Sequence, residues 1–202
     1  MSEPEIHKYC ELMEEVKLRM NVFDFFLTGK GHALYAPTTV ESVALQLRKI
    51  LELIAFGSLV ANKESYSAAY EKFASNWNAR LMLRDLERIN PDFYPKPVVE
   101  APSSDPRVLH QLKDRQPDYL TKDEFERAYD KCGAIMHADN PYGSRVEVKY
   151  YLEKLPEWRT KILNLLNNHQ IKLFNEPGFF LIHMKENQDE KVHAYRFQPP
   201  PA

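Results

Sequence analysis

The residues whose types and spacing could support chemistry lie between Tyr129 and Pro141, in the segment YDKCGAIMHADNP. Asp130 and His137 are seven positions apart. An α-helix repeats about every 3.6 residues, so on one helix both side chains would point nearly the same way. Asn140 follows in the break that Pro141 forces. A histidine near a helix end, with an acid and an amide close by, could act as a general acid or base.

The same segment also has a purely structural interpretation. Basic side chains in the last turn of a helix can hydrogen-bond its final carbonyl groups, so His137 could be a helix cap. An asparagine followed by a proline is also a common way for a chain to leave a helix. Residue types alone leave both interpretations of His137 open.

A basic residue several positions before a histidine, on a late helix that follows long paired helices, resembles the HEPN group of helical domains. The motif of that group is Arg, four to six residues, then His, often with a polar residue directly after the Arg. The position that fits here is Lys131, with five residues between it and His137, and Cys132 follows it. The resemblance extends from Glu41 to about Asn168.

Many HEPN proteins are metal-independent ribonucleases of toxin–antitoxin and phage-defence systems and act as dimers. The resemblance implies attack of an RNA 2′-hydroxyl on the adjacent phosphate, with His137 as acid or base. Lys131 would stabilise charge on the phosphate oxygens, with Asp130 and Asn140 in support. The implied partners are a second copy of the chain and single-stranded RNA or a partner protein, without a metal or cofactor.

Lysine in place of arginine departs from the HEPN motif. Arginine offers a planar fork that suits a phosphate, whereas Lys131 supplies a single point charge. If this departure marks loss of activity, the domain would be catalytically inactive and would bind a protein or a small ligand, such as a nucleotide.

Composition limits the class of protein. The 202 residues carry a net charge of −2, with a pI of about 6.4, which argues against broad binding to duplex nucleic acid. Cys10 and Cys132 are far apart and form no CxxC pair, as expected for free thiols in a reducing compartment. No run of about 18 apolar residues and no secretory signal is present, so we expect a cytoplasmic protein without a membrane span.

The first ninety residues predict helices. A capping box at Ser2–Glu5 begins the first, and Gly29 with Gly31 can end it. A second box at Thr38–Glu41 begins another. Its segment VALQLRKILELIAFGSLVA is apolar around most of its circumference, which is typical of a helix in the middle of a bundle. Two shorter helices are expected at 65–73 and 76–89, with Trp77 in the core.

The middle of the chain changes character. Residues 91–120 contain six prolines and predict an extended, irregular connection with a short strand at 108–112. A third capping box, Thr121–Glu124, begins a helix that we expect to reach about His137. Another helix should begin at residue 144, and Pro156 should kink it or divide it.

The last thirty residues predict three short strands, at 171–174, 178–185 and 191–197. His183 and His193 could face each other across two of them, but two histidines alone do not hold zinc. The expected fold is mainly α: a helical bundle with long antiparallel helices plus a small C-terminal three-stranded antiparallel β-meander. We expect one folded unit and a homodimer, with a helical domain at 1–169 and the meander at 170–198.

Overall fold

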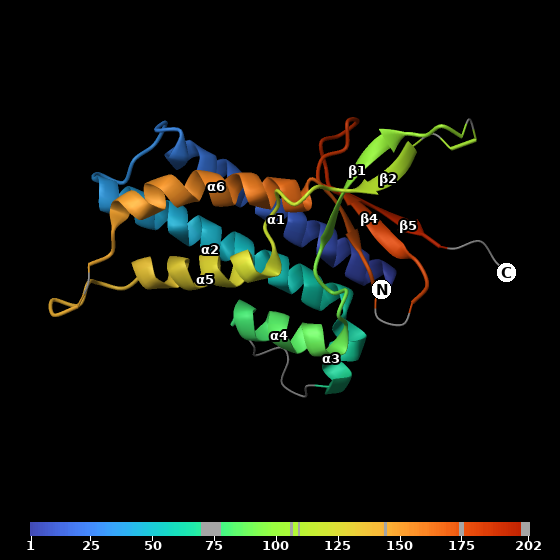
Figure 1. The fold of residues 1–202 in the computed structure, drawn as a ribbon, viewed down its shortest axis with the longest axis horizontal. Coiled ribbons are helices and arrows are strands. Elements are labelled where there is room, and N and C mark those ends of the chain that lie inside the picture. Colours follow the sequence, from blue (N-terminus) through green and yellow to red (C-terminus); the bar gives the residue numbers. More distant parts are fainter. Residues whose placement is uncertain (70–77, 106, 109, 144, 174–175, 199–202) are drawn as a thin grey trace.

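The computed structural model describes residues 1–69, 78–105, 107–108, 110–143, 145–173 and 176–198. In these residues the chain forms six helices and one five-stranded sheet (Figure 1). The helices are α1 (Glu3–Leu27), α2 (Ala36–Ala61), α3 (Lys63–Ala69), α4 (Ala79–Ile89), α5 (Lys122–Ile135) and α6 (Val148–Leu166). The strands are β1 (Lys96–Pro102), β2 (His110–Asp114), β3 (Asn168–Ile171), β4 (Phe179–His183) and β5 (His193–Phe197).

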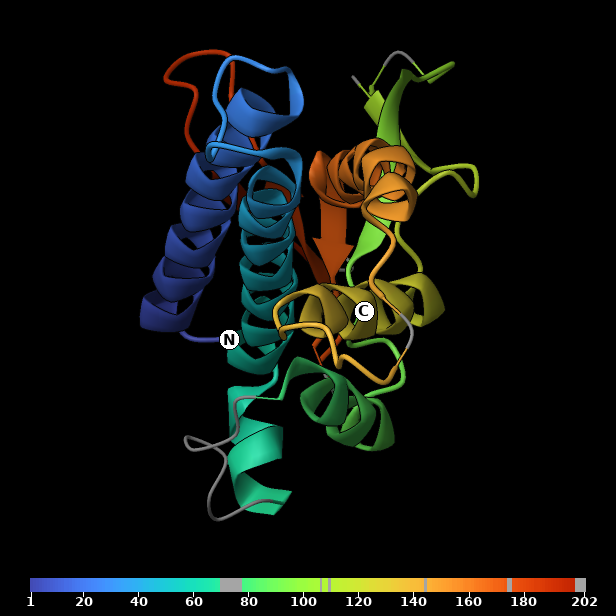
Figure 2. The same ribbon diagram turned by 90° about the vertical axis from the view of Figure 1, so that its left-hand side faces the viewer.

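Helix α2 is the centre of the helical layer. It contacts all five other helices, and Figure 2 shows α1 on one side of it with α5 and α6 on the other. Buried residues recur over its whole length, from Val40 to Ala61. Burying that much apolar surface is the main favourable term in folding. The prediction that this segment lies in the middle of a bundle is confirmed.

Two of the three predicted helix starts are confirmed. The Glu5 carboxylate accepts a hydrogen bond from the Ser2 backbone N–H at 2.8 Å, at the start of α1. At the start of α5, the Thr121 hydroxyl accepts from the Glu124 N–H and the Glu124 carboxylate accepts from the Thr121 N–H. Each pair satisfies donors that the first turn of a helix otherwise leaves unpaired.

The predicted start of α2 at Thr38 is wrong. The helix begins at Ala36, after the N-cap residue Tyr35, because Pro37 is well suited to a first turn. The Thr38 and Thr39 hydroxyls therefore lie inside the helix and donate to the Tyr35 carbonyl, at 3.0 and 3.1 Å.

Helix α6 is not divided at Pro156, although division was one of the two outcomes that the sequence predicted. It runs as one helix from Val148 to Leu166. Proline removes the N–H that would bond to the carbonyl of Leu152, but both residues lie on the exposed side of α6. Water can therefore replace the missing bond.

The sheet has five antiparallel strands in the order β2-β1-β3-β4-β5, where we expected a three-stranded meander. The other two strands come from the proline-rich connection: β2 corresponds to the short strand predicted at 108–112, and β1 was not predicted. The prolines of β1 are tolerated because each has only one strand neighbour: Pro97 lies opposite β3 and Pro102 opposite β2. A proline without a second neighbour needs no N–H on its free side.

Smaller differences concern element boundaries. The strand expected at 171–174 is β3, which begins at Asn168, directly after α6. The helices expected at 65–73 and 76–89 correspond to α3 and α4. Their parts within 70–77, including Trp77, lie outside the described residues.

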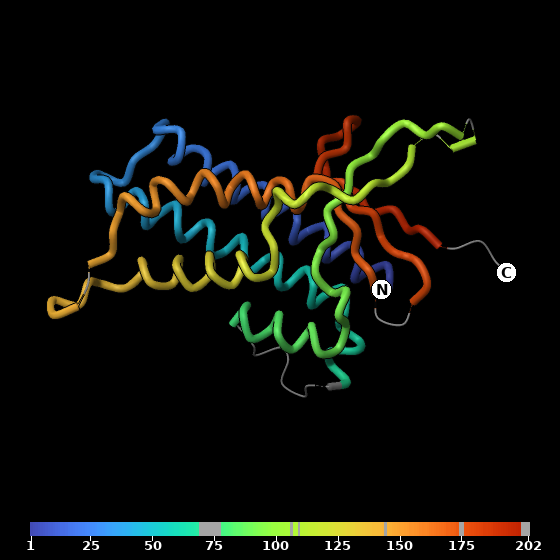
Figure 3. The backbone as a smooth tube through the Cα atoms, in the orientation of Figure 1, coloured from blue at the N-terminus to red at the C-terminus, as the bar shows by residue number. Residues whose placement is uncertain are grey.

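The first helix holds the C-terminal strands in place. The Tyr9 hydroxyl lies 2.8 Å from Nε2 of His169 in β3, and the Val192 N–H donates to the Glu14 carboxylate at 2.7 Å. Figure 3 follows α1 as it passes beside the C-terminal strands. One contiguous cluster of buried side chains includes residues of the helices and of β3 and β4, and Ala194 of β5 packs against it.

His169 is fully buried at this junction. Its Nδ1 lies 2.6 Å from the Leu166 carbonyl, which can only accept, so Nδ1 carries the proton and the Tyr9 hydroxyl donates to Nε2. Burial lowers the pKa of His169 to about 4, because the charged ring would lose its hydration. The ring is therefore neutral in the folded protein at pH 7.

We expect His169 to make the fold acid-sensitive. Between pH 6.5 and about 4 the unfolded chain binds a proton at this histidine that the folded chain does not. The free energy of unfolding should therefore fall with pH over this window, by up to about 3 kcal/mol from this group, and its contribution should level off below it. Urea unfolding at a series of pH values measures the effect.

The variant His169→Gln should be less stable at pH 7 and should lose most of this pH dependence. His7→Gln is the control, because His7 is exposed on α1. An equally steep pH dependence in His169→Gln and in the wild type would contradict this assignment.

Candidate functional site

The helix that carries the predicted site is shorter than expected. Helix α5 ends at Ile135 and Met136 is its C-cap, so His137 lies just beyond the helix. The Met136 N–H donates to the carbonyls of Gly133 and Ala134. The His137 ring is exposed, and within the described residues it makes no hydrogen bond or ion pair. The backbone thus closes this helix end, and the ring does not act as the cap.

Asp130 points toward α4. Its Oδ2 lies 2.7 Å from Nη1 of Arg80, and its side chain is about half exposed, at 54%. The carboxylate is therefore already occupied by a cation from another helix. It is not directed at His137 as a partner for proton transfer.

Lys131 points toward α6. Its ammonium group lies 5.1 Å from the centre of the Tyr150 ring, a cation–π contact. The Lys131 carbonyl also accepts a hydrogen bond from the Tyr151 hydroxyl at 2.8 Å. The backbone and the side chain of Lys131 thus both contribute to packing between α5 and α6.

Asn140 organises its own loop. Its side-chain oxygen accepts from the Tyr142 N–H at 3.0 Å, and its carbonyl accepts from the Gly143 N–H at 2.9 Å. This is an Asx-type turn, for which asparagine before proline is well suited. The four predicted site residues therefore have separate surroundings, and within the described chain no hydrogen bond or ion pair joins their side chains.

The buried face of α5 explains why the predicted site residues are separated. Its buried residues, which pack toward α2, are Phe125, Ala128, Tyr129, Cys132 and Ile135. With those positions turned inward, Lys131 lies beside the buried face and Asp130 lies on the exposed side of the helix. Burial raises the pKa of the Cys132 thiol to about 12, so it stays protonated and unreactive at neutral pH.

The sequence analysis did not identify Arg48 as a partner of this helix. Arg48 lies on α2, with its guanidinium 4.0 Å from the centre of the Tyr129 ring and Nη2 2.7 Å from the Tyr129 hydroxyl. Glu52 pairs with the same guanidinium at 3.3 Å. The sequence feature that could have indicated this contact is Gly133, a glycine inside a helix. A Cβ atom at this position would lie only 2.9 Å from Arg48 Nη1.

A shallow hollow of about 600 Å³ lies between the end of α5 and the start of α2, with His137 at its edge. The described residues that line it include the carboxylate of Glu41 but no lysine or arginine. The hollow therefore favours a neutral or cationic group over a phosphate.

The predicted histidine pair does form on the sheet. His183 and His193 are cross-strand partners in β4 and β5. The two rings contact different carboxylates, however. His183 lies between Glu100 at 2.7 Å and Glu186 at 3.0 Å, and His193 contacts Asp189 at 3.1 Å. In the described part of the chain, no group of three or more ligating side chains could hold a metal ion.

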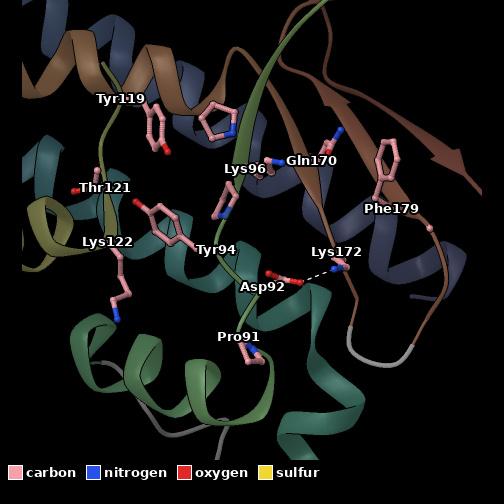
Figure 4. Close-up of a pocket in the computed structure, with 13 residues that line it drawn as sticks. Pro91, Asp92, Tyr94, Lys96, Tyr119, Thr121, Lys122, Gln170, Lys172 and Phe179 are labelled. Atoms are coloured by element: carbon pink, nitrogen blue, oxygen red, sulfur yellow. Dashed lines mark hydrogen bonds and ion pairs between the residues drawn. The ribbon is translucent and has the colours of Figure 1, made fainter. Parts of the chain in front are cut away.

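A second, polar cleft of similar volume lies where the sheet meets the segments around α4 and α5 (Figure 4). Its volume is about 590 Å³, within the usual range for small-molecule sites. The side chains that matter below come from three separate segments of the chain: Asp92, Tyr94, Lys96, Tyr119, Lys122, Gln170, Lys172 and Phe179.

Three lysines line this cleft, and each of them forms an ion pair. Lys96 pairs with Asp114 at 2.7 Å, Lys122 with Glu87 at 2.5 Å and Lys172 with Asp92 at 2.5 Å. Of these carboxylates only that of Asp92 lines the cleft. No short motif contains these lysines, because they are far apart in the sequence.

Comparisons with known proteins add no assignment. The chain matches no protein-family model, and neither curated proteins nor solved structures gave a significant match. The resemblance to HEPN domains therefore stays a prediction from the sequence. Among the helices within the described ranges, none has both the length and the apolar character that crossing a membrane requires.

We expect His137→Ala to leave the stability of the protein almost unchanged. The ring makes no hydrogen bond or ion pair in the described residues, so the free energy of unfolding should change by less than about 0.5 kcal/mol. Thr121→Ala, at the other end of α5, is the matched comparison and should cost about 1 kcal/mol, because its hydroxyl is a true N-cap. Urea unfolding at pH 7 measures both. Equal losses would mean that His137 does stabilise the helix end.

Proposed function

We propose that this protein is a catalytically inactive, mainly helical binding protein whose ligand occupies the polar cleft at the sheet. The observation that carries this proposal is the separation of the four predicted catalytic residues. Asp130 pairs with Arg80, Lys131 lies over Tyr150, and Asn140 closes its own turn. Within the described residues, the His137 ring makes no hydrogen bond or ion pair with an acid or a cation.

The electrostatics of the hollow beside His137 also favour this proposal. Cleavage of RNA at a histidine requires positive charge close to the scissile phosphate. The hollow contains Glu41 and no basic side chain among its described lining residues. In the cleft at the sheet, by contrast, three lysines line one cavity: Lys96, Lys122 and Lys172.

A metal-independent endoribonuclease that acts as a homodimer is the second candidate. The observation in its favour is that the His137 ring is exposed and borders an open hollow. A second copy of the chain would have to supply the missing cation. Exposed apolar side chains near this end of the bundle, such as Leu34, Tyr35 and Met136, are available for contact with such a copy.

A cleavage assay separates the two proposals. Purified full-length protein is incubated with single-stranded RNA in the presence of a chelator, which silences contaminating metal-dependent nucleases. We expect no cleavage above background by the wild type or by His137→Ala, since His137 has no catalytic partner in the described chain.

His7→Ala is the control for the loss of a histidine, because His7 is exposed on a different helix. Cleavage by the wild type and by His7→Ala, but not by a folded His137→Ala, would overturn the binding proposal in favour of the ribonuclease. Sedimentation analysis of the same samples would then show whether the active species is a dimer.

A further inference from the structure

The strand register brings two lysines of the cleft together. Lys96 in β1 lies opposite Gln170 in β3, and Lys172 is two positions further along the same side of the chain. Diagonal neighbours of this kind in an antiparallel pair lie about 7–8 Å apart, within reach of long side chains. The two ammonium groups and the Gln170 amide can therefore converge on one anion.

Aromatic rings border these lysines. In Figure 4, Tyr94 and Tyr119 lie on one side of Lys96, and Gln170, Lys172 and Phe179 lie on the other. Tyr94 is held by a hydrogen bond from its hydroxyl to the Leu120 carbonyl, and Phe179 stacks on Phe197. Within the described chain, the half-buried Tyr119 makes neither a hydrogen bond nor a ring contact. Tyr119 packs partly against the hydrophobic core and also lines the cleft, so the part of its ring that faces the cleft can contact a ligand.

We propose that this cleft binds a nucleotide, with the phosphate between Lys96 and Lys172 and the base against Tyr119. This inference rests on the proposed binding function and names its ligand class. Lysine is a common phosphate ligand, and an aromatic ring can stack on any base. A ligand with an anionic end and a flat ring matches the two parts of the cleft.

The ion pairs already present do not block this ligand. The pairs of Lys96 with Asp114 and of Lys172 with Asp92 are more than half exposed on both sides. Exposed ion pairs contribute little to stability, so a phosphate can displace either carboxylate. Asp92 lines the cleft itself and would repel a phosphate, so it should weaken binding.

The test is calorimetric titration of the full-length protein with AMP, GMP, CMP and UMP, and separately with adenosine and inorganic phosphate. We expect nucleotides to bind at least about tenfold more tightly than adenosine or phosphate alone, since each of these lacks one of the two contacts. Lys96→Gln and Lys172→Gln should each weaken nucleotide binding roughly tenfold. Tyr119→Leu should weaken it several-fold.

Two further variants sharpen the test. Lys185→Gln is the matched control and should bind like the wild type, because Lys185 is an equally exposed, ion-paired lysine outside the cleft. Asp92→Asn should bind more tightly, because it frees Lys172 and removes a like charge. Circular dichroism and thermal melting verify that each variant is folded.

A further titration with a short oligouridylate shows whether the ligand is a free nucleotide or part of an RNA strand. Tighter binding than UMP, with the same dependence on Lys96 and Lys172, would support the same chemistry with an RNA strand as the ligand. The inference is overturned if none of the four nucleotides binds at millimolar concentration, or if phosphate alone binds as well. It is also overturned if the cleft variants match Lys185→Gln.

The failure of this inference is distinguishable from that of the proposed function. Absence of both nucleotide binding and RNA cleavage would reject the ligand class and leave a catalytically inactive binding protein. RNA cleavage that depends on His137 would reject the proposed function, whatever the titrations show.

Discussion

The structure depends on the burial of helix α2. Its middle has apolar residues around most of its circumference, so no single neighbour can cover it, and all five other helices of the described chain contact it. The polar exceptions, Arg48 and Glu52, are half-buried and satisfied by each other and by Tyr129. A half-buried charge of this kind is tolerated only with such partners, because desolvation would otherwise disfavour it.

The burial of α2 also determines where the predicted catalytic residues lie. Helix α5 must turn Tyr129 and Cys132 toward α2. Lys131 then falls beside the buried face, where it meets Tyr150 of α6, and Asp130 falls on the exposed side, where it pairs with Arg80 of α4. The helix also ends at Ile135, so His137 does not continue its face. The packing that stabilises the bundle is thus what separates the candidate site.

The sheet adds a second constraint. Strand β3 begins two residues after α6 ends. His169 in this strand is buried and hydrogen-bonded to Tyr9 of α1. This junction places the other side of β3 at the polar cleft. The hairpin of β1 and β2 then joins the free edge of β3 and brings Lys96 opposite Gln170. A cavity that combines lysines with aromatic rings arises where these segments meet.

The sequence by itself determined the elements that depend on local chemistry. The capping boxes at Ser2 and Thr121, the apolar periodicity of α2 and the short strand segments near the C-terminus depend on residues that are close together in the chain, so they can be recognised from the sequence alone. The helix that Pro156 was expected to kink or divide and the strand missed at Pro97 show the limit of such rules. In both cases the tertiary environment removed the cost of the proline, through solvent for the first and a missing strand neighbour for the second.

The candidate sites were decided by tertiary structure alone. The direction of Asp130 and of Lys131 depends on which helices flank α5, and nothing in the HADNP segment encodes α4 or α6. The cleft depends on lysines that are separated by many residues and meet only through strand register and helix packing. Spacing along the chain specifies a helix face, but side chains from different segments come together only when a buried core fixes where those segments lie.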